Sequence, residues 1–153
     1  MANTYTQIHI QAVFAVQGRR SLIHPDWKDE LFKYISGIFR NQKQKLLAIG
    51  GVEDHIHLLF GARPNVAISD LLRDVKANSS AFVNEQRLVR GRFSWQEGYG
   101  AFSYSKSQID VVTKYVLNQE KHHARRSFKD EYVTLLDRFE VEYDKRYLFD
   151  WIG

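Results

Sequence analysis

Short apolar runs interleaved with polar positions predict four strands. The first covers residues 4–16, which are dense in Ile, Val, Phe and Thr and end at the turn that Gly18 begins. Residues 45–52 and 55–61 form two more, and the two intervening positions, Glu53 and Asp54, predict a hairpin. A fourth strand is expected around residues 101–105, at the end of a stretch rich in glycine and aromatic residues.

Apolar residues at three- and four-residue spacing predict helices between these strands. The first helix opens at Pro25 and Asp26, and the second follows a break at Pro64 and Asn65. Their apolar stripes are Trp27, Leu31, Tyr34, Ile35, Ile38 and Phe39 in the first helix, and Ile68, Leu71, Leu72, Val75, Phe82 and Val83 in the second.

Two further helices are predicted in the last third of the chain. One opens at Ser107, which forms a capping-box pattern with Asp110, and runs to about His123. Ser127 and Asp130 repeat that pattern ahead of the last helix. The apolar positions of the last helix are Tyr132, Leu135, Leu136 and Phe139.

The predicted order is strand, helix, strand, strand, helix, strand, helix, helix. Hairpins with interspersed helices indicate an α/β (α+β) sandwich with a mostly antiparallel central sheet that helices cover. No repeat, low-complexity tract or Pro-, Gly- or Ser-rich linker interrupts the chain, so residues 1–153 are expected to form one domain.

Composition and charge narrow the chemistry. The chain has no cysteine, which excludes disulfides, thiolate zinc sites and a cysteine nucleophile. Its net charge of +4 is uneven: 19 bases and 11 acids give residues 1–129 a charge of +8, whereas seven acids and three bases give residues 130–153 a charge of −4. This asymmetry favours a polyanionic partner such as nucleic acid, although a solvated mixed-charge surface fits the same counts. We expect neither a signal peptide nor a membrane span.

Two of the six histidines form the sequence His55-Ile56-His57 on the second strand of the predicted hairpin. Residues two apart in a strand face the same side, so both imidazoles should project together while Ile56 enters the opposite layer. Two imidazoles on a rigid strand can supply two ligands of a metal site. The spacing also fits two partly exposed sheet histidines that bind nothing.

Tyr115 and Gln119 are four residues apart on the third predicted helix, so they should lie one turn apart on the same face. Val112 and Val116 border that face and place it near the body of the protein. Taken alone, Tyr115 fits an ordinary packing role better than a catalytic one.

Two basic clusters could contact phosphates, and each also fits an exposed, solvated segment. The first follows the third predicted helix and the second follows the second helix. Their members are Lys121, His122, His123, Arg125, Arg126 and Lys129, and Arg87, Arg90 and Arg92.

Four tracts resemble the single-tyrosine HUH transposases of insertion sequences, which include TnpA-like proteins and the repeat-associated tyrosine transposases. Residues 50–60 (GGVEDHIHLLF) resemble the HUH signature of that family, and residues 115–123 (YVLNQEKHH) resemble its catalytic helix. Residues 95–103 (WQEGYGAFS) resemble the segment before that helix, and the closing residues 142–147 (EYDKRY) are also similar. The likeness covers nearly the whole chain.

The resemblance implies a ferredoxin-like HUH endonuclease fold and a definite chemistry. His55, His57 and Gln119 would hold a divalent ion, Mg²⁺ or Mn²⁺, although these ligand types do not exclude zinc. Tyr115 would attack single-stranded DNA and form a 5′-phosphotyrosine with a free 3′-hydroxyl. A phenol is a good leaving group for the return step, so joining would require no nucleotide cofactor.

The resemblance also implies a cytoplasmic protein of a bacterial or archaeal cell, single-stranded or hairpin DNA as substrate, and a homodimer. In that family the tyrosine helix often serves the histidines of the other subunit, and the sequence leaves assembly in cis or in trans open. Two alternatives remain: a domesticated, non-catalytic module that binds single-stranded DNA or RNA, and a metalloprotein with unrelated hydrolytic chemistry.

Overall fold

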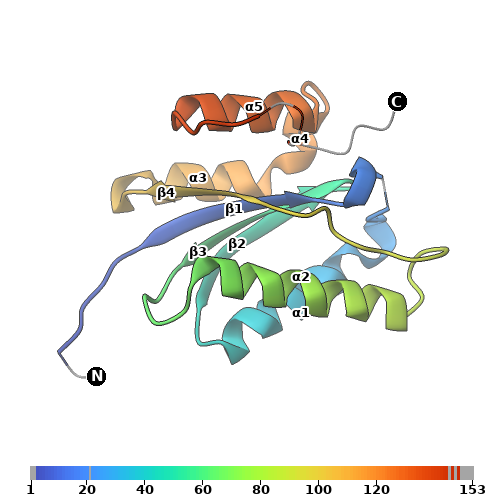
Figure 1. Cartoon of the computed structure of the whole chain (residues 1–153), viewed down its shortest axis with the longest axis horizontal. Coiled ribbons are helices and arrows are strands. Elements are labelled where there is room, and N and C mark those ends of the chain that lie inside the picture. The colour runs from blue at the N-terminus through green and yellow to red at the C-terminus, as the bar shows by residue number, and fades with distance from the viewer. Residues whose placement is uncertain (1–2, 21, 145, 147, 149–153) are drawn as a thin grey trace.

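A four-stranded sheet forms the centre of the computed structural model, which describes residues 3–20, 22–144, 146 and 148. The strands lie in the order β2-β3-β1-β4 (Figure 1). They are β1 (His9–Ala15), β2 (Lys45–Val52), β3 (His55–Gly61) and β4 (Gly100–Tyr104), and every neighbouring pair is antiparallel. The predicted α+β sandwich with an antiparallel sheet is therefore confirmed.

Helices cover both faces of this sheet (Figure 1). On one face lie α1 (Pro25–Asn41) and α2 (Ile68–Glu85). On the other lie α3 (Ile109–Leu117), α4 (Gln119–His123) and α5 (Phe128–Arg138). None of the helices in the described part of the chain combines the length and apolarity needed to cross a bilayer.

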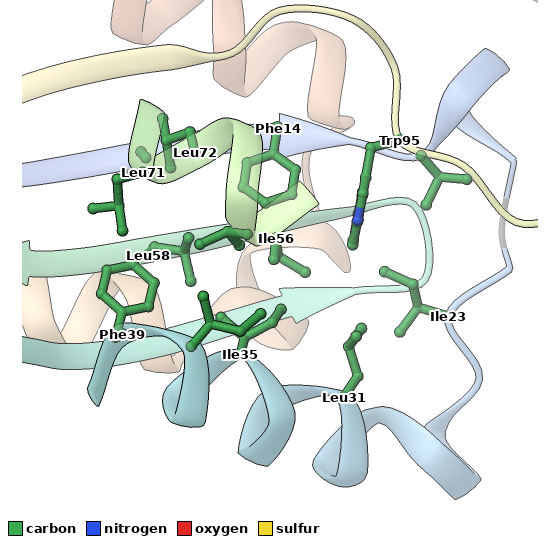
Figure 2. Packing of buried hydrophobic residues seen from close by; sticks show 14 of the residues in the cluster. Phe14, Ile23, Leu31, Ile35, Phe39, Ile56, Leu58, Leu71, Leu72 and Trp95 are labelled. Atoms are coloured by element: carbon green, nitrogen blue, oxygen red, sulfur yellow. The ribbon is translucent and has the colours of Figure 1, made fainter. Parts of the chain in front are cut away.

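The main apolar core lies between the sheet and the α1–α2 layer, as Figure 2 shows. Even-numbered residues of the two central strands enter it, among them Phe14 of β1 and Ile56 of β3. Leu31 and Ile35 of α1 are fully buried against these strands, because helical spacing keeps them on one stripe. This layer fixes the central strands and leaves their odd-numbered side chains to the opposite face.

Three of the odd-numbered residues of β1 and β3 have buried polar side chains. Gln11, His55 and His57 have no exposed surface and lie on the face that α3, α4 and α5 cover. Val13 of β1 pairs directly with His57 in the ladder. Strand alternation therefore sends the even-numbered apolar side chains to the α1–α2 layer and places the candidate chemistry in the other layer, beside apolar residues such as Val13 and Leu59.

The first strand is shorter than predicted. It begins at His9 and not at residue 4, because His9 already pairs with Gly61 and Tyr104, the last residues of the two partner strands. Residues 3–8 have no strand left to pair with, and their exposed Thr, Tyr and Gln side chains add no burial. In the closing tract that resembles the transposases, residues 145 and 147 lie outside the described residues.

The helix boundaries confirm one predicted cap and correct another. Ser127 caps α5 by accepting a hydrogen bond from the Asp130 N–H at 3.2 Å, as the sequence predicted. The capping box predicted at Ser107 and Asp110 is wrong. Ser105 is the capping residue, and its N–H donates to the side-chain oxygen of Gln108, three positions later, at 3.0 Å. A short 3-10 turn, Lys106–Gln108, therefore precedes α3.

The predicted helix from Ser107 to His123 is also broken in the middle. Asn118 has φ −102° and ψ 28°, which ends α3 and begins α4 in a new direction. Asn is a poor residue for a helix interior because its side chain competes for nearby backbone groups. The break separates Tyr115 from Gln119.

Two glycines offer a paired test of how tightly α3 seats on the sheet. A Cβ at Gly50 of β2 would lie 1.8 Å from the Val116 carbonyl oxygen, whereas a Cβ at Gly37 in α1 would meet nothing within 4 Å. We expect Gly50→Ala to destabilise the fold by about 2 kcal/mol or more, since α3 would have to move. Gly37→Ala should stabilise it by about 0.5–1 kcal/mol through helix propensity. Urea denaturation measures both, and an equal response at the two positions would contradict this packing.

Candidate metal and tyrosine site

The two histidines of β3 lie side by side in the interior. His55 and His57 have no exposed surface, and their ring centroids are 5.2 Å apart. They project on the same face of the strand, as the spacing predicted. Because β3 lies between β2 and β1, its backbone is held on both sides and the two rings have a rigid base.

Each imidazole is oriented through its Nδ1 atom. His55 Nδ1 lies 2.7 Å from Asp54 Oδ1, and His57 Nδ1 lies 2.7 Å from Gln11 Oε1. The Gln11 amide donates through Nε2 to the Tyr104 hydroxyl at 2.8 Å, so its Oε1 is the acceptor for His57. When a metal binds, a proton on each Nδ1 would leave both Nε2 lone pairs pointing together, which is the arrangement that metal-binding histidines need. Without an ion, a proton on Nε2 can instead be donated to Glu131.

A glutamate from α5 completes this cluster. Glu131 is 4% exposed, and its Oε1 lies 3.0 Å from His57 Nε2 and 3.4 Å from His55 Nε2. The same oxygen lies 3.0 Å from Nε2 of His123 at the end of α4. One carboxylate oxygen therefore sits among three imidazole nitrogens.

The donor atoms are spaced to share one cation. The ligand atoms of His55, His57 and Glu131 all lie within 4.8 Å of one another. Ligands roughly 2.1 Å from a single ion at octahedral or tetrahedral angles lie about 3.0–3.4 Å apart, which matches the separations from Glu131 to the two histidines. This group could therefore hold a metal ion, and its two nitrogens and one oxygen suit several divalent ions.

Burial and hydrogen bonds shift the acidity of these groups in opposite directions. Burial lowers the pKa of His57 to about 4, so its imidazole is neutral and available as a ligand. Burial also opposes a charge on His55, but its contacts with Asp54 and Glu131 outweigh this and raise its pKa. For Glu131, burial alone would raise the pKa, whereas hydrogen bonds from His123, His55 and His57 hold it well below its usual range.

Tyr115 on α3 reaches the same carboxylate. Its hydroxyl donates to Glu131 Oε2, and its ring meets His57 edge-on with centroids 5.6 Å apart. Burial and the neighbouring negative charge of Glu131 raise the pKa of this phenol far above its usual value. Glu131 thus links Tyr115 to the histidines, one oxygen facing each.

Gln119 joins the cluster from the start of α4. It is 1% exposed, and its Oε1 lies 3.3 Å from His55 Nε2 and 3.1 Å from His123 Nε2. Its Nε2 donates to the Tyr115 carbonyl oxygen at 3.1 Å, the acceptor that the residue-119 N–H would use in an unbroken helix. The Gln119 side chain therefore replaces the backbone bond at the break and turns its own oxygen toward the histidines.

Comparison with known proteins identifies the family of the chain. The sequence profile described as "Transposase IS200 like" matches residues 4–119. The chain belongs to this family.

Relatives of this chain share its fold at low sequence identity. It is 22% identical to the ISDra2 transposase TnpA of Deinococcus radiodurans over 118 residues, which are 74% of this chain and 84% of that protein. The crystal structure of a protein assigned as a transposase from Deinococcus radiodurans R1 has a TM-score of 0.59 and 22% identity, covering 76% of this chain and 94% of that one. A REP-associated tyrosine transposase bound to a REP hairpin has a TM-score of 0.56 and 14% identity, covering 74% of this chain and 67% of that one.

The basic cluster after α3 contains one partly buried residue, His123, and several exposed ones. His123 is only partly exposed and lies in the cluster with Glu131, whereas it was expected at the surface among the phosphate contacts. The ring of His122 lies 4.8 Å from the Tyr115 ring, measured between centroids. Lys121, His122, Arg125, Arg126 and Lys129 are exposed.

The second basic cluster lies away from the histidines in sequence and in space. Arg87, Arg90 and Arg92 are all exposed and belong to the segment that leaves α2. This segment lies on the α1–α2 side of the sheet, opposite the layer that holds Tyr115 (Figure 1). The structure therefore does not bring these arginines together with the candidate site.

Three residues of the site were missed in the sequence: Glu131, Gln11 and, as a partner of His55, Asp54. A usable signal existed for Glu131. The buried stripe of α5 contains Phe128, Tyr132 and Leu135, and Glu131 occupies a position of the same stripe. An acid on the buried stripe of a helix needs a partner, because burying an unpaired charge is costly.

Proposed function

We propose that this transposase cleaves and rejoins single-stranded DNA through a covalent 5′-phosphotyrosine at Tyr115, with a divalent metal beside it. One observation carries the proposal: the Tyr115 hydroxyl and the Nε2 atoms of His55 and His57 contact the same carboxylate, that of Glu131. A tyrosine that served only in packing would not need its hydroxyl on the carboxylate that contacts two oriented imidazoles.

The metal in this proposal is Mg²⁺ or Mn²⁺, bound by His55, His57 and side-chain oxygen from Gln119, as the family resemblance implies. The distances support Glu131 as a further oxygen ligand, since it lies closer to His57 than any other carboxylate of the described residues. When bound, the ion would polarise the scissile phosphate and stabilise the charge that develops on it.

The residues of the chain contribute orientation and control of a proton. Asp54 and Gln11 hold the two imidazoles in one tautomer, so the ligand geometry is prepared in advance. Glu131 accepts a hydrogen bond from the Tyr115 hydroxyl, and its negative charge keeps the phenol protonated until a phosphate enters. In the attack on phosphorus the Tyr115 oxygen gives up its proton, which Glu131 is placed to accept, and the 3′ oxygen of the scissile bond leaves as the free hydroxyl.

The DNA partner is also part of the proposal. The solved REP-associated transposase is bound to a REP hairpin, and we expect single-stranded or hairpin DNA as the substrate here. The exposed Lys121, His122, Arg125 and Arg126, on α4 and just after it, suit its phosphates, with Arg87, Arg90 and Arg92 as a second set. We keep a homodimer in the proposal, although Tyr115 already lies beside the histidines of its own chain.

The experiment is the direct detection of the covalent intermediate. Labelled single-stranded DNA hairpins incubated with the protein and Mg²⁺ or Mn²⁺ should give a protein–DNA adduct that survives a denaturing gel. A chelator should remove the adduct, and restored Mn²⁺ should bring it back. Hairpin binding without an adduct, for substrates carrying the cleavage sequence from the DNA beside the gene, would favour the non-catalytic binding module.

A further inference from the structure

A second candidate binding site lies at the other end of the sheet. A groove of about 1100 Å³ opens between the segment before β1, the end of α1, the start of β2 and the residues after β3. We call it the far-end groove; Arg40, Lys43, Lys45 and Arg63 are its basic residues. It lies where the N-terminal segment leaves the sheet, far from α4 and α5 (Figure 1).

The charge of this groove is uncompensated. Its lining contains those four basic side chains and no acidic one. All four are exposed, and none of them forms an ion pair within the described ranges of the chain. Four unpaired cations around one hollow repel one another, so an anionic ligand with several charges would be favoured there.

Two buried polar atoms of the groove also lack a partner. Gln44 is 6% exposed, and its Oε1 accepts from the Arg63 N–H at 2.8 Å, which fixes the amide and leaves Nε2 without an acceptor among the described residues. His9 Nδ1 is likewise buried and unpartnered in the described chain. Buried polar groups without partners are rare in folded proteins and mark sites where a ligand or water completes the bonding.

Lys43 adds a backbone feature. It follows the C-terminus of α1 with φ 56°, a left-handed conformation that glycine adopts without strain and a lysine does not. The lysine therefore places a cation at the groove in a conformation that glycine would adopt with less strain, as residues of binding sites often do.

We propose that the far-end groove binds the phosphodiester backbone of the DNA that flanks the cleavage site. The choice of DNA as the polyanion rests on the function proposed above. Gly61 at the groove and His55 at the candidate metal site are the two ends of β3, roughly 20 Å apart at the rise of a strand. That length corresponds to about six base pairs of duplex, so one substrate could occupy both places. The exposed ring of Tyr5 at the rim, 89% accessible, could stack on an unpaired base.

The test compares two variants that lose the same charge. One carries Lys43→Gly, Lys45→Ala and Arg63→Ala in the groove, and the control carries Lys33→Ala, Lys106→Ala and Arg138→Ala on exposed positions elsewhere. Fluorescence anisotropy across a salt series would use three probes: a hairpin with a single-stranded 5′ extension, its stem as a blunt duplex, and the extension alone. We expect the groove variant to bind at least about tenfold more weakly, with a log–log salt slope shallower by roughly 2, and the control to change by less than about threefold.

Each outcome bears on the proposal. Weakening that is limited to extended probes, and that Tyr5→Ala repeats, assigns the groove to the single strand; weakening on the blunt duplex assigns it to the stem. Equal affinity and slope in the groove and control variants would overturn the proposal. The adduct assay on the parent protein tests the proposed cleavage separately from the groove. If the parent forms no adduct but the groove variant still loses DNA binding, the cleavage proposal fails and the groove proposal holds. The groove variant should melt at the temperature of the parent, because glycine suits the left-handed position 43 and residues 45 and 63 are exposed, so a loss of binding would not reflect unfolding.

Discussion

Phenylalanine at position 115 is expected to abolish the covalent protein–DNA adduct and to lower strand cleavage at least about 1000-fold. The substitution removes one oxygen and keeps the ring, so the edge contact with His57 and the contact with His122 remain. Glu131 loses the Tyr115 donor but keeps its three histidine partners, so we expect a stability change of only about 1 kcal/mol. Hairpin affinity should stay close to that of the parent.

The matched control for this variant is Tyr143→Phe. The Tyr143 hydroxyl donates to Asp137 at 3.2 Å, outside the histidine cluster, so its loss should leave the adduct unchanged. An adduct that persists in Tyr115→Phe would move the nucleophile elsewhere. Tyr104 would be the first candidate, because its hydroxyl is bonded to the glutamine that orients His57.

Alanine in place of His57 is expected to abolish metal binding and to lower cleavage by more than about 100-fold. The imidazole contributes the Nε2 atom at 3.0 Å from Glu131 and is neutral because burial lowers its pKa to about 4. Its removal leaves Gln11 Oε1 and Glu131 in a buried space without that partner. Calorimetric titration with Mn²⁺ would measure the loss, and circular dichroism would show that the fold is retained.

His24→Asn is the control for this second change. His24 Nδ1 caps α1 by accepting from the Asp26 N–H at 3.1 Å, and asparagine can keep that cap while losing the imidazole. Its Mn²⁺ affinity and cleavage should equal those of the parent. Parent-like Mn²⁺ binding in His57→Ala would refute the assignment of this histidine as a ligand.

Local sequence patterns predicted the histidine strand and its hairpin well. Both strands, Lys45–Val52 and His55–Gly61, have the predicted bounds, because alternation and a two-residue turn are local features. The start of β1 was misplaced because strand length depends on where the partner strands end, and β3 and β4 both end opposite His9. That information is spread over the whole chain.

The sequence predicted only part of the candidate site, because the rest again depends on contacts between distant segments of the chain. His55 and His57 are two residues apart, so strand geometry alone places them together. Glu131 meets His57 across 74 residues of chain, and only the packing of α5 through Phe128 and Tyr132 brings it there. The break at Asn118 depends on the Gln119 side chain replacing a backbone bond, which no helical period encodes.

The carboxylate link between Tyr115 and the two histidines has a consequence for variation among relatives. The family match ends at Gln119, whereas the carboxylate that joins Tyr115 to both imidazoles lies on α5, beyond that boundary. Two proteins could therefore share every residue of the common segment and differ in the helix that follows. Under the function proposed above, exchange or divergence of this downstream helix would leave the residues of the family match unchanged and alter when Tyr115 loses its proton, so lineages could change the onset of strand cleavage without changing the residues that define the family.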